Sequence, residues 1–294
     1  MCQKSKITGQ LKYGKLLADN RTRDIPWKTV HVDLIGPWKV SVKYEDGKTK
    51  EHQIQALTCI DAATDFCEII AIRNKASDYI SMKFDNHFLC RYPRPVEVVY
   101  DQGSEFKSEF SELLLSYGIK PIPTTVKNPT ANAIIERTHL TMGDMLRGKE
   151  FQVSNNWTWH DEVDCTLQSV AWALRSTVSA TIKRSPGQLA FNRDMIMNMQ
   201  IHSNWKNIAE TRRRQTIADN IRENDNRIEH DYKIYDQVLV KLNAFERRNQ
   251  RKIGDAPTRG PYTIIQKYSN GTVRIKKGNY EETISIRRVK PFQT

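Results

Sequence analysis

The sequence predicts an α/β fold built on a mixed sheet, followed by a small all-β barrel. In the first two thirds of the chain, strand patterns come first, and strand and helix patterns then alternate, which is typical of a mixed sheet with helices on its faces. After Tyr235 the chain holds short β-branched segments separated by turn residues. With 294 residues the chain is too long for one small domain, so we expect two domains and connecting arms.

The first strands are expected to form hairpins. The first predicted strand, residues 30–35, shows the side-chain alternation of a strand and is rich in β-branched residues. Gly36-Pro37 is expected to end it. A second strand follows, with Asp46-Gly47 as a turn signal beside it. The next hairpin turns around residues 61–65, where turn chemistry explains Asp61 and Asp65. The predicted strands are residues 30–35, 38–43, 54–60 and 67–72.

Strand and helix patterns then alternate. A short apolar strand ends directly before Asp101, and a later helix stops at Gly118. Two prolines interrupt the strand that follows, which indicates an edge strand. Trp157, Trp159 and Trp172 fall at helical spacing, and we expect them in the core or at a subunit contact. The predicted segments are helices at 77–90, 108–117, 130–147 and 157–176, a helix from Ser185-Pro186, and strands at 96–100 and 120–124.

These patterns divide the chain into four parts. In the last part, Asn270-Gly271 is a strong hairpin signal between two strands. The strands of this part are expected at residues 238–240, 262–265, 272–275 and 283–286. The parts are an N-terminal arm at 1–27 with a weak helix at 9–19, an α/β core at 28–200, a charged helical linker at 201–233, and a β-barrel at 234–294.

The formal charge of +12 is carried by the two ends of the chain. Residues 1–30 carry +5, residues 231–294 carry +8, and residues 31–230 carry −1. A near-neutral centre between basic flanks suits a polyanion such as nucleic acid. Basic faces can equally be solvated surface, so charge alone leaves both interpretations open.

The cysteines and the hydropathy argue against a disulfide-rich, zinc-binding, membrane-spanning or secreted protein. The five cysteines are odd in number and lack metal-ligand spacing, so we expect a reducing compartment, no disulfide framework and no zinc. The chain has no run of 18 apolar residues, and its first 30 residues lack the apolar stretch of a secretory signal. We therefore expect no association with a membrane.

Three carboxylates occur where the predicted topology can bring them together. Asp33 lies in the first strand among apolar neighbours, Asp101 follows a buried-type strand, and Glu136 lies in the first turns of a helix. A carboxylate in an apolar strand is costly to bury unless it is paired, hydrogen-bonded or bound to a metal. Two or three carboxylates on rigid elements can hold two Mg²⁺ ions, which prefer hard oxygen ligands and serve phosphodiester chemistry.

The motifs around these acids resemble those of integrases from retroviruses and gypsy-type retrotransposons. The segment Asp101–Phe106 resembles the family's Asp-x-Gly-x-x-Phe motif, and Lys127–Arg137 resembles its loop-and-helix motif. Trp27–Pro37 resembles the segment that carries the first aspartate. Between Asp101 and Glu136 there are 34 residues, one fewer than the family usually has, and the sequence realigns at Gly118-Ile119.

The resemblance continues beyond the acids and covers nearly all of the chain. Ser185–Arg193 is similar to a segment of gypsy-type proteins, and Gly260-Pro261-Tyr262 with residues 284–292 looks like their C-terminal module. Members of the family also carry an N-terminal His-His-Cys-Cys zinc module. Here Cys2-Gln3-Lys4 resembles only its end, so we expect that most of this module is lacking.

The resemblance implies a ribonuclease-H-like core and a metal-dependent integrase. Asp33, Asp101 and Glu136 would be both the catalytic residues and the ligands of Mg²⁺ or Mn²⁺, with two ions expected. The reaction would trim the 3′ ends of element DNA and then join them to target DNA. The expected partners are double-stranded DNA, as element ends and as target, and further copies of the chain. The expected location is the nucleus, after an element particle in the cytoplasm.

Several other polar residues are weaker candidates. Asn132 and Arg137 flank Glu136 on the helix, where they can contact DNA or lie in solvent. His139, three residues after Glu136, can assist the site but is more typical of a packing or surface histidine. The candidate DNA contacts are Asn132, Arg137, Lys127, Arg247, Arg248, Arg251 and Lys252.

Two other functions stay open. A truncated or domesticated copy can bind DNA or a partner protein without catalysis, although all three acids are intact. A different nuclease or a DNA transposase can use the same core, but the Gly260-Pro261-Tyr262 module argues against both. Metal-dependent nicking would distinguish the enzyme from a binding protein.

Overall fold

The computed structural model describes residues 12–16, 24–124, 133–154, 156–242, 256–268 and 271–292. The chain forms two compact units. The larger unit contains residues 22–126 and 130–211, and the smaller unit contains residues 1–21, 127–129 and 212–294. Each unit has its own apolar core, so each is described by itself.

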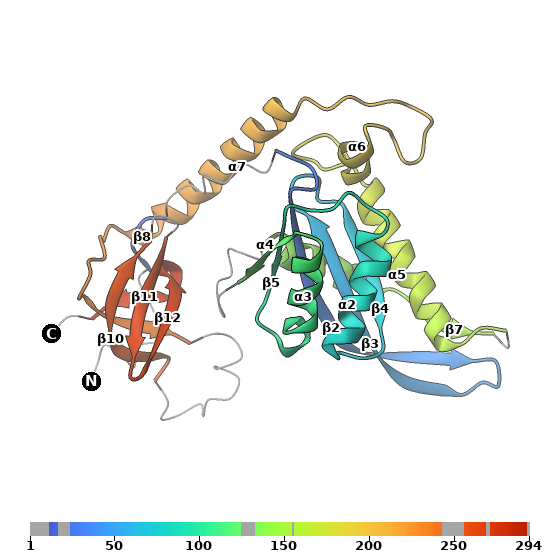
Figure 1. Cartoon of the computed structure of the whole chain (residues 1–294), viewed down its shortest axis with the longest axis horizontal. Coiled ribbons are helices and arrows are strands. Elements are labelled where there is room, and N and C mark those ends of the chain that lie inside the picture. The colour runs from blue at the N-terminus through green and yellow to red at the C-terminus, as the bar shows by residue number, and fades with distance from the viewer. Residues whose placement is uncertain are drawn as a thin grey trace. The chain divides into compact units, whose positions relative to one another are not determined.

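The larger unit is built on a six-stranded mixed sheet (Figure 1). The strand order is β4-β3-β2-β5-β6, and β7 also pairs with β2. Strands β2, β3 and β4 are antiparallel neighbours, whereas β5, β6 and β7 join in parallel. This confirms the predicted mixed sheet and the predicted edge position of β6. The strands are β2 (Thr29–Tyr44), β3 (Thr49–Asp61), β4 (Cys67–Ile72), β5 (Glu97–Tyr100), β6 (Lys120–Pro123) and β7 (Phe151–Val153).

Gly36-Pro37 does not end the first strand, and that prediction was wrong. β2 runs through it, and the register with β3 shifts between Ile35 and Trp38, so the dipeptide forms a β-bulge. Gly36 has φ 99°, and a Cβ there would lie 2.6 Å from the carbonyl oxygen of Ile54. Only glycine fits this approach of two strands. The turn predicted around Asp46-Gly47 is present, with the Gly47 N–H donating to the Tyr44 carbonyl at 3.0 Å.

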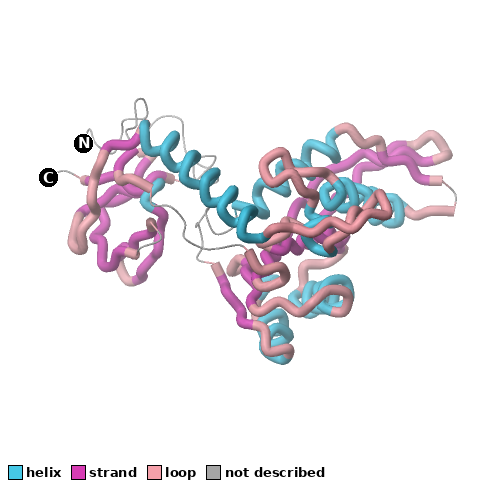
Figure 2. Tube along the Cα trace, turned by 90° about the horizontal axis from the view of Figure 1, so that it is seen from above, coloured by secondary structure: helices cyan, strands magenta, loops and turns pink. Residues whose placement is uncertain are grey.

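Helices cover both faces of this sheet (Figure 2). Because side chains alternate along a strand, Val30 and Val32 pack on the face covered by α2 and α3, together with Leu57 of β3. Ala56 packs on the opposite face, against α4 and α5. The helices are α2 (Ser77–Phe84), α3 (Glu109–Ser116), α4 (Ala133–Arg147), α5 (Trp159–Ser176), α6 (Pro186–Phe191) and α7 (Trp205–Asp225).

Some boundaries differ from those predicted. The helix expected at 77–90 ends as an α-helix at Phe84 and continues as a π-helical turn, Asp85–Leu89. β7 was not predicted, because a three-residue strand is too short to show alternation. Of the three tryptophans expected in the core or at a subunit contact, Trp159 packs against the core, whereas Trp157 and Trp172 are each 47% exposed.

After α7, the described part of the smaller unit is built mainly of β-strands, as predicted. Five antiparallel strands follow the order β12-β11-β10-β9-β13 around an apolar core. Gly260-Pro261 lies in a second bulge, where Gly260 has φ 127° and a Cβ would lie 2.8 Å from the Val238 carbonyl oxygen. Asn270 of the predicted hairpin turn lies outside the described residues. The strands are β9 (Gln237–Lys241), β10 (Thr258–Lys267), β11 (Thr272–Lys277), β12 (Tyr280–Ser285) and β13 (Val289–Pro291).

A two-stranded parallel sheet joins the N-terminal segment to this unit. It pairs β1 (Lys12–Tyr13) with β8 (Arg227–Ile228), so the weak helix predicted at 9–19 is wrong where the structure describes it. Arg227 is buried and donates to the carbonyl oxygens of Tyr13 and Gly14 at 2.7 and 2.6 Å. Glu223 of α7 forms ion pairs with Arg227 and Arg287, which ties the end of that helix to the smaller unit.

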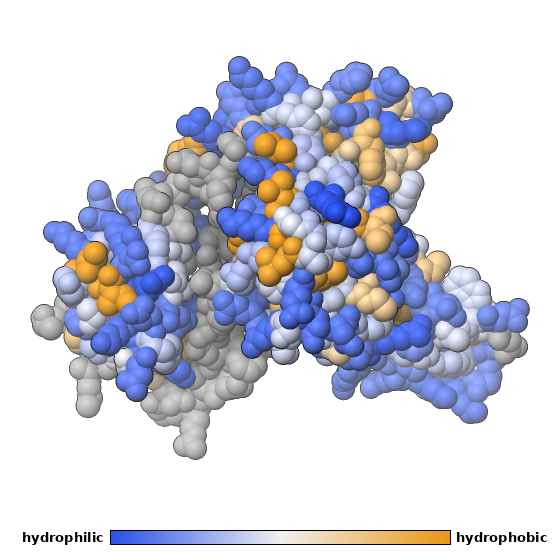
Figure 3. Space-filling view, viewed as in Figure 1, coloured by the Kyte–Doolittle hydropathy of each residue, from blue (hydrophilic) through white to orange (hydrophobic). Residues whose placement is uncertain are grey.

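The visible surface is mainly hydrophilic, and apolar side chains gather on it in small separate patches (Figure 3). Among the residues that the structure describes, no helix combines the length and the apolar character needed to cross a membrane. Four cysteines in this part of the chain are free thiols, namely Cys59, Cys67, Cys90 and Cys165.

Candidate active site

Asp33 lies in the middle of the larger sheet, on the face covered by α4 and α5. It pairs with Thr58 of β3, and its neighbours Val32 and Leu34 point to the opposite face. Its carboxylate is 22% exposed, and Oδ1 accepts a hydrogen bond from the Leu34 N–H at 2.9 Å. The alternation that buries the flanking apolar residues therefore presents this carboxylate on the other face.

The register of two parallel strands places Asp101 beside Asp33. β2 and β5 pair with Val30 opposite Val98 and His31 opposite Val99. Continued by two residues, the same offset brings Asp101 next to Asp33, directly after the end of β5. Asp101 Oδ1 accepts the Gly103 N–H at 2.9 Å, which fixes the carboxylate in the turn that follows the strand.

α4 carries the third acid over the same face of the sheet. Ile135 and Met142 are buried against the sheet and α5, and His139, which lies between them, reaches β3. These positions share one side of the helix because they are three or four residues apart. Glu136 follows Ile135 and is exposed, so its carboxylate lies at the margin of the helix–sheet contact.

The acids interact electrostatically. Burial and the negative charges of Asp101, Glu105 and Glu136, against the lowering effect of the Leu34 N–H, together raise the pKa of Asp33 to about 7. The structure thus brings Asp101 and Glu136 within electrostatic reach of Asp33. Glu105 is an acid that the sequence interpretation did not select. The sequence signal that could have identified Glu105 is its position inside the Asp101–Phe106 motif. Its carboxylate packs against Gly103.

The donor set fits hard divalent cations. Among the described residues, no group of three or more His, Cys, Asp or Glu side chains is close enough together to hold a metal ion. However, burial and the neighbouring acids Asp101, Glu105 and Glu136 all raise the pKa of Asp33, and no basic side chain is among the groups that act on it. Carboxylate oxygens are the ligands that Mg²⁺ prefers, and a divalent cation would relieve this repulsion. Asp33 and Asp101, with Glu136 from α4, are the residues that fit this role.

His139 lies partly buried beside Asp33, in a position that is compatible both with the predicted packing role and with a role in the site. Its Nδ1 lies 4.0 Å from Asp33 Oδ2, and its Nε2 lies 2.8 Å from Thr58 Oγ1. Thr58 Oγ1 also donates to the carbonyl oxygen of Asp33 at 3.0 Å. Burial lowers the pKa of His139 to about 4, so the ring is neutral at neutral pH.

The other predicted contacts are only partly described. Arg137 is exposed on α4, one residue beyond Glu136. The remaining candidates lie outside the described residues, so their predicted role stays a prediction. They are Lys127, Asn132, Arg247, Arg248, Arg251 and Lys252.

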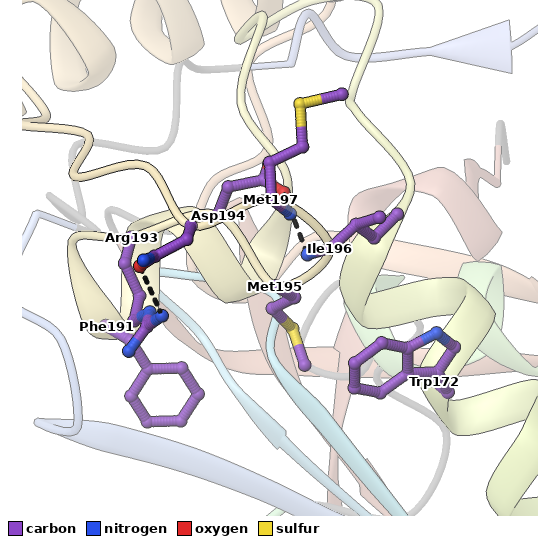
Figure 4. A pocket seen from close by; sticks show the side chains of 8 residues that line it. Trp172, Phe191, Arg193, Asp194, Met195, Ile196 and Met197 are labelled. Carbon is purple, nitrogen blue, oxygen red and sulfur yellow. Dashed lines mark hydrogen bonds between the residues drawn. The ribbon is translucent and has the colours of Figure 1, made fainter.

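A separate apolar cavity of about 290 Å³ lies between α5, α6 and the loop that follows α6. Figure 4 shows Trp172 and Ile196 on one side of it and Phe191 with Arg193 on the other. Arg193 donates to Asn198 at 3.3 Å, which closes the loop on itself. The residues that line it come from elements other than those that carry the acids, so the cavity is distinct from the acidic site.

Comparison of the sequence with known proteins points to retroelements. No protein-family model matches the chain. The retrovirus-related Pol polyprotein from transposon 412 of Drosophila melanogaster is 27% identical over 165 residues, which are 56% of this chain and 12% of that polyprotein. Gypsy retrotransposon integrase-like protein 1 of Homo sapiens is 28% identical over 173 residues, which are 58% of this chain and 30% of that protein. The chain thus spans less than a third of either relative.

The fold matches a solved structure over its whole length. A chain in the cryoEM structure of the simian T-cell lymphotropic virus intasome in complex with PP2A regulatory subunit B56 gamma has a TM-score of 0.60 and 14% identity. The match covers 100% of this chain and 87% of that one. The fold class is therefore a ribonuclease-H-like α/β core followed by an all-β domain, as predicted. Within that class, the chain is similar in sequence to gypsy retrotransposon integrase-like proteins and a retrovirus-related Pol polyprotein, which agrees with the resemblance that its motifs indicated.

Proposed function

We propose that the chain is a retroelement integrase that trims the 3′ ends of element DNA and joins them to target DNA. The observation that carries the proposal is the register of β2 and β5, which sets Asp33 beside Asp101 on the sheet face covered by α4. Glu136 adds a third carboxylate within electrostatic reach of Asp33. The kinship with integrases connects this arrangement to phosphodiester chemistry.

The three acids would act by binding and orienting. Asp33 stands in β2, Asp101 directly after the end of β5, and Glu136 on a helix, so together they can hold Mg²⁺ or Mn²⁺, with two ions expected. Bound divalent ions activate the attacking oxygen and stabilise the leaving oxygen in such reactions. No covalent intermediate with the protein is needed, because positioning and charge stabilisation carry phosphoryl transfer.

The basic ends of the chain supply the expected contacts to DNA. Residues 231–294 carry +8 and residues 1–30 carry +5, whereas the part with the acids is nearly neutral. Contacts of this kind to phosphates make binding steeply dependent on salt. We also propose Arg137 of α4 as a contact to DNA, because it is exposed beside Glu136. Assembly into homo-oligomers and action in the nucleus belong to the same proposal.

The alternative is a domesticated, integrase-derived protein that binds DNA without catalysis. Gypsy retrotransposon integrase-like protein 1, a human protein, is among the relatives, which keeps this alternative open. The two functions share the basic flanks and the fold. They differ in whether the acids are used.

Strand transfer tests the proposal. The purified chain is incubated with a short duplex that has a recessed 3′ end, with Mg²⁺ or Mn²⁺, and joined products are measured. We expect metal-dependent products that disappear with Glu136→Gln and with Asp33→Asn. Asp144→Asn is the matched control, because Asp144 is an exposed acid on the same helix that pairs with Arg147. Salt-sensitive DNA binding without any metal-dependent product would favour the non-catalytic alternative.

A further inference from the structure

The hydrogen bonds of Thr58 determine which nitrogen of His139 carries the proton. A threonine hydroxyl has a single hydrogen to donate. Thr58 Oγ1 gives it to the carbonyl oxygen of Asp33 at 3.0 Å, and a carbonyl oxygen can only accept. The contact of 2.8 Å between Thr58 Oγ1 and His139 Nε2 must therefore be donated by Nε2–H. A neutral ring with hydrogen on Nε2 has its lone pair on Nδ1.

That lone pair lies close to the carboxylate of Asp33. The distance from Nδ1 to Asp33 Oδ2 is 4.0 Å, and the other carboxylate oxygen accepts the Leu34 N–H. Both atoms are electron-rich, and neither has a hydrogen to donate to the other when the carboxylate is ionised. Two such atoms repel each other in a partly buried site, and a cation between them would relieve the repulsion. The side chains of His139 and Asp33 are 16% and 22% exposed, so water screens them little.

The separation also suits a shared ion. Bonds from a metal to imidazole nitrogen and carboxylate oxygen are about 2.1 Å long, so two ligands of one ion lie about 3.0 to 4.2 Å apart, depending on the angle between the bonds. The observed 4.0 Å falls within this range.

We propose that His139 Nδ1, held in this tautomer by Thr58, is a ligand of the divalent ion that Asp33 binds. This adds a nitrogen ligand to the site of oxygen ligands and rests on the proposed integrase function. Imidazole suits transition metals, whereas Mg²⁺ prefers oxygen ligands and water. The site therefore binds Mn²⁺ more tightly than an all-carboxylate site of the same charge, and Mg²⁺ gains less from the nitrogen.

Binding of Mn²⁺ to the full chain tests this without a catalytic readout. Free Mn²⁺ is titrated by electron paramagnetic resonance, and pulsed measurements detect hyperfine coupling of the bound ion to ¹⁴N. We expect nitrogen coupling in the unaltered chain and its loss in His139→Ala, with Mn²⁺ binding at least about tenfold weaker. Mg²⁺ affinity, measured by competition, should fall by a smaller factor.

The variants separate a ligand from a packing residue. His139→Asn keeps an N–H donor for Thr58 without an imidazole, so it should fold normally and still lose the coupling. Thr58→Val removes the hydroxyl that fixes the tautomer and should weaken Mn²⁺ binding, whereas Thr58→Ser should restore it. His202→Ala is the matched control, because His202 is exposed elsewhere in the larger unit. It should change neither measurement.

Two results would overturn the inference in distinguishable ways. If Mn²⁺ binds in a manner that depends on Asp33 but shows no ¹⁴N coupling in the unaltered chain, His139 is not a ligand, and the proposed function stands. If the chain binds no Mn²⁺ and gives no strand transfer, both proposals fail together.

Discussion

The buried ion pair between Arg175 and Glu68 is expected to be a main link between α5 and the larger sheet. Nη2 of Arg175 lies 2.5 Å from Glu68 Oε2, and the side chains are only 11% and 5% exposed. Arg175 Nε also donates to the carbonyl oxygen of Cys67 at 2.6 Å, and its guanidinium lies over the ring of Phe66, 4.8 Å from the centroid. Tyr92 donates its hydroxyl hydrogen to the other oxygen of Glu68.

Arg175→Met should destabilise the larger unit strongly. It would leave the Glu68 carboxylate buried with the Tyr92 hydroxyl as its remaining donor, and removal of one partner of a buried pair costs about 3–5 kcal/mol. For a unit of this size, that corresponds to a fall in melting temperature of roughly 6–20 °C. Because Glu68→Gln removes the charge that Arg175→Met leaves unpaired, the double variant should lose about 1–3 kcal/mol less than the sum of the single variants.

Tryptophan fluorescence can follow this unit selectively. All six tryptophans lie between residues 27 and 205, within the larger unit. Unfolding in urea is measured for the chain, the two single variants and the double variant. Arg147→Met is the matched control, because its ion pair with Asp144 is 77% and 67% exposed and should change stability by less than about 0.5 kcal/mol. Equal effects of Arg175→Met and Arg147→Met would refute the reasoning.

Three further predictions concern the bulge and the two buried aspartates. Gly36→Ala should cost at least about 2 kcal/mol more in urea unfolding than Gly47→Ala, since both glycines have positive φ but only Gly36 meets a carbonyl oxygen at 2.6 Å; equal costs would contradict the steric argument. Burial raises the pKa of Asp61, so the folded chain holds that proton to a higher pH than the unfolded chain. The free energy of unfolding of the unaltered chain, compared with that of Asp61→Asn, should therefore be greatest below pH 3.8 and should decrease as the pH rises through the raised pKa of Asp61. A difference between the two proteins that does not change with pH would contradict this prediction. Asp101→Asn should lower the pKa of Asp33 in metal-free buffer, because Asp101 has the largest effect on it after burial; an NMR titration of Asp33 that shows no change would contradict their proximity.

Much of the fold could be predicted because its long elements show their periodicity. The β2–β3–β4 strands, α4, α5 and the all-β character of the smaller unit all appear as regular patterns of apolar residues. The end of the first strand was predicted wrongly at Gly36-Pro37. Such a dipeptide usually ends a strand, but here it forms a bulge, which only the pairing of β2 with β3 shows. β1, β7 and β8 have two or three residues each, which is too few for a pattern to show.

The residues of the candidate site also divide into those that the sequence could predict and those that it could not. Asp33 and Asp101 could be selected because each stands at a strand position where a carboxylate needs a partner, and the parallel register then sets them side by side. His139 could not be assigned from the sequence. Its role depends on Thr58, which lies 81 residues away and reaches it only because β3 pairs with β2. Contacts between distant segments of this kind carry no local signal.

The comparison of Asp33 with Asp61 shows why burial alone does not mark a functional acid. Burial raises the pKa of both carboxyl groups. Asp61, however, accepts hydrogen bonds from the Trp27 N–H, the Thr64 N–H and the Thr64 hydroxyl, which use both of its oxygens. In the described part of the chain, the carboxylate of Asp33 accepts a hydrogen bond from its neighbour Leu34 and faces three other carboxylates. The protein satisfies Asp61 internally, whereas the side chains around Asp33 leave the charge of its carboxylate unbalanced, which is consistent with the proposed role of Asp33 as a metal ligand.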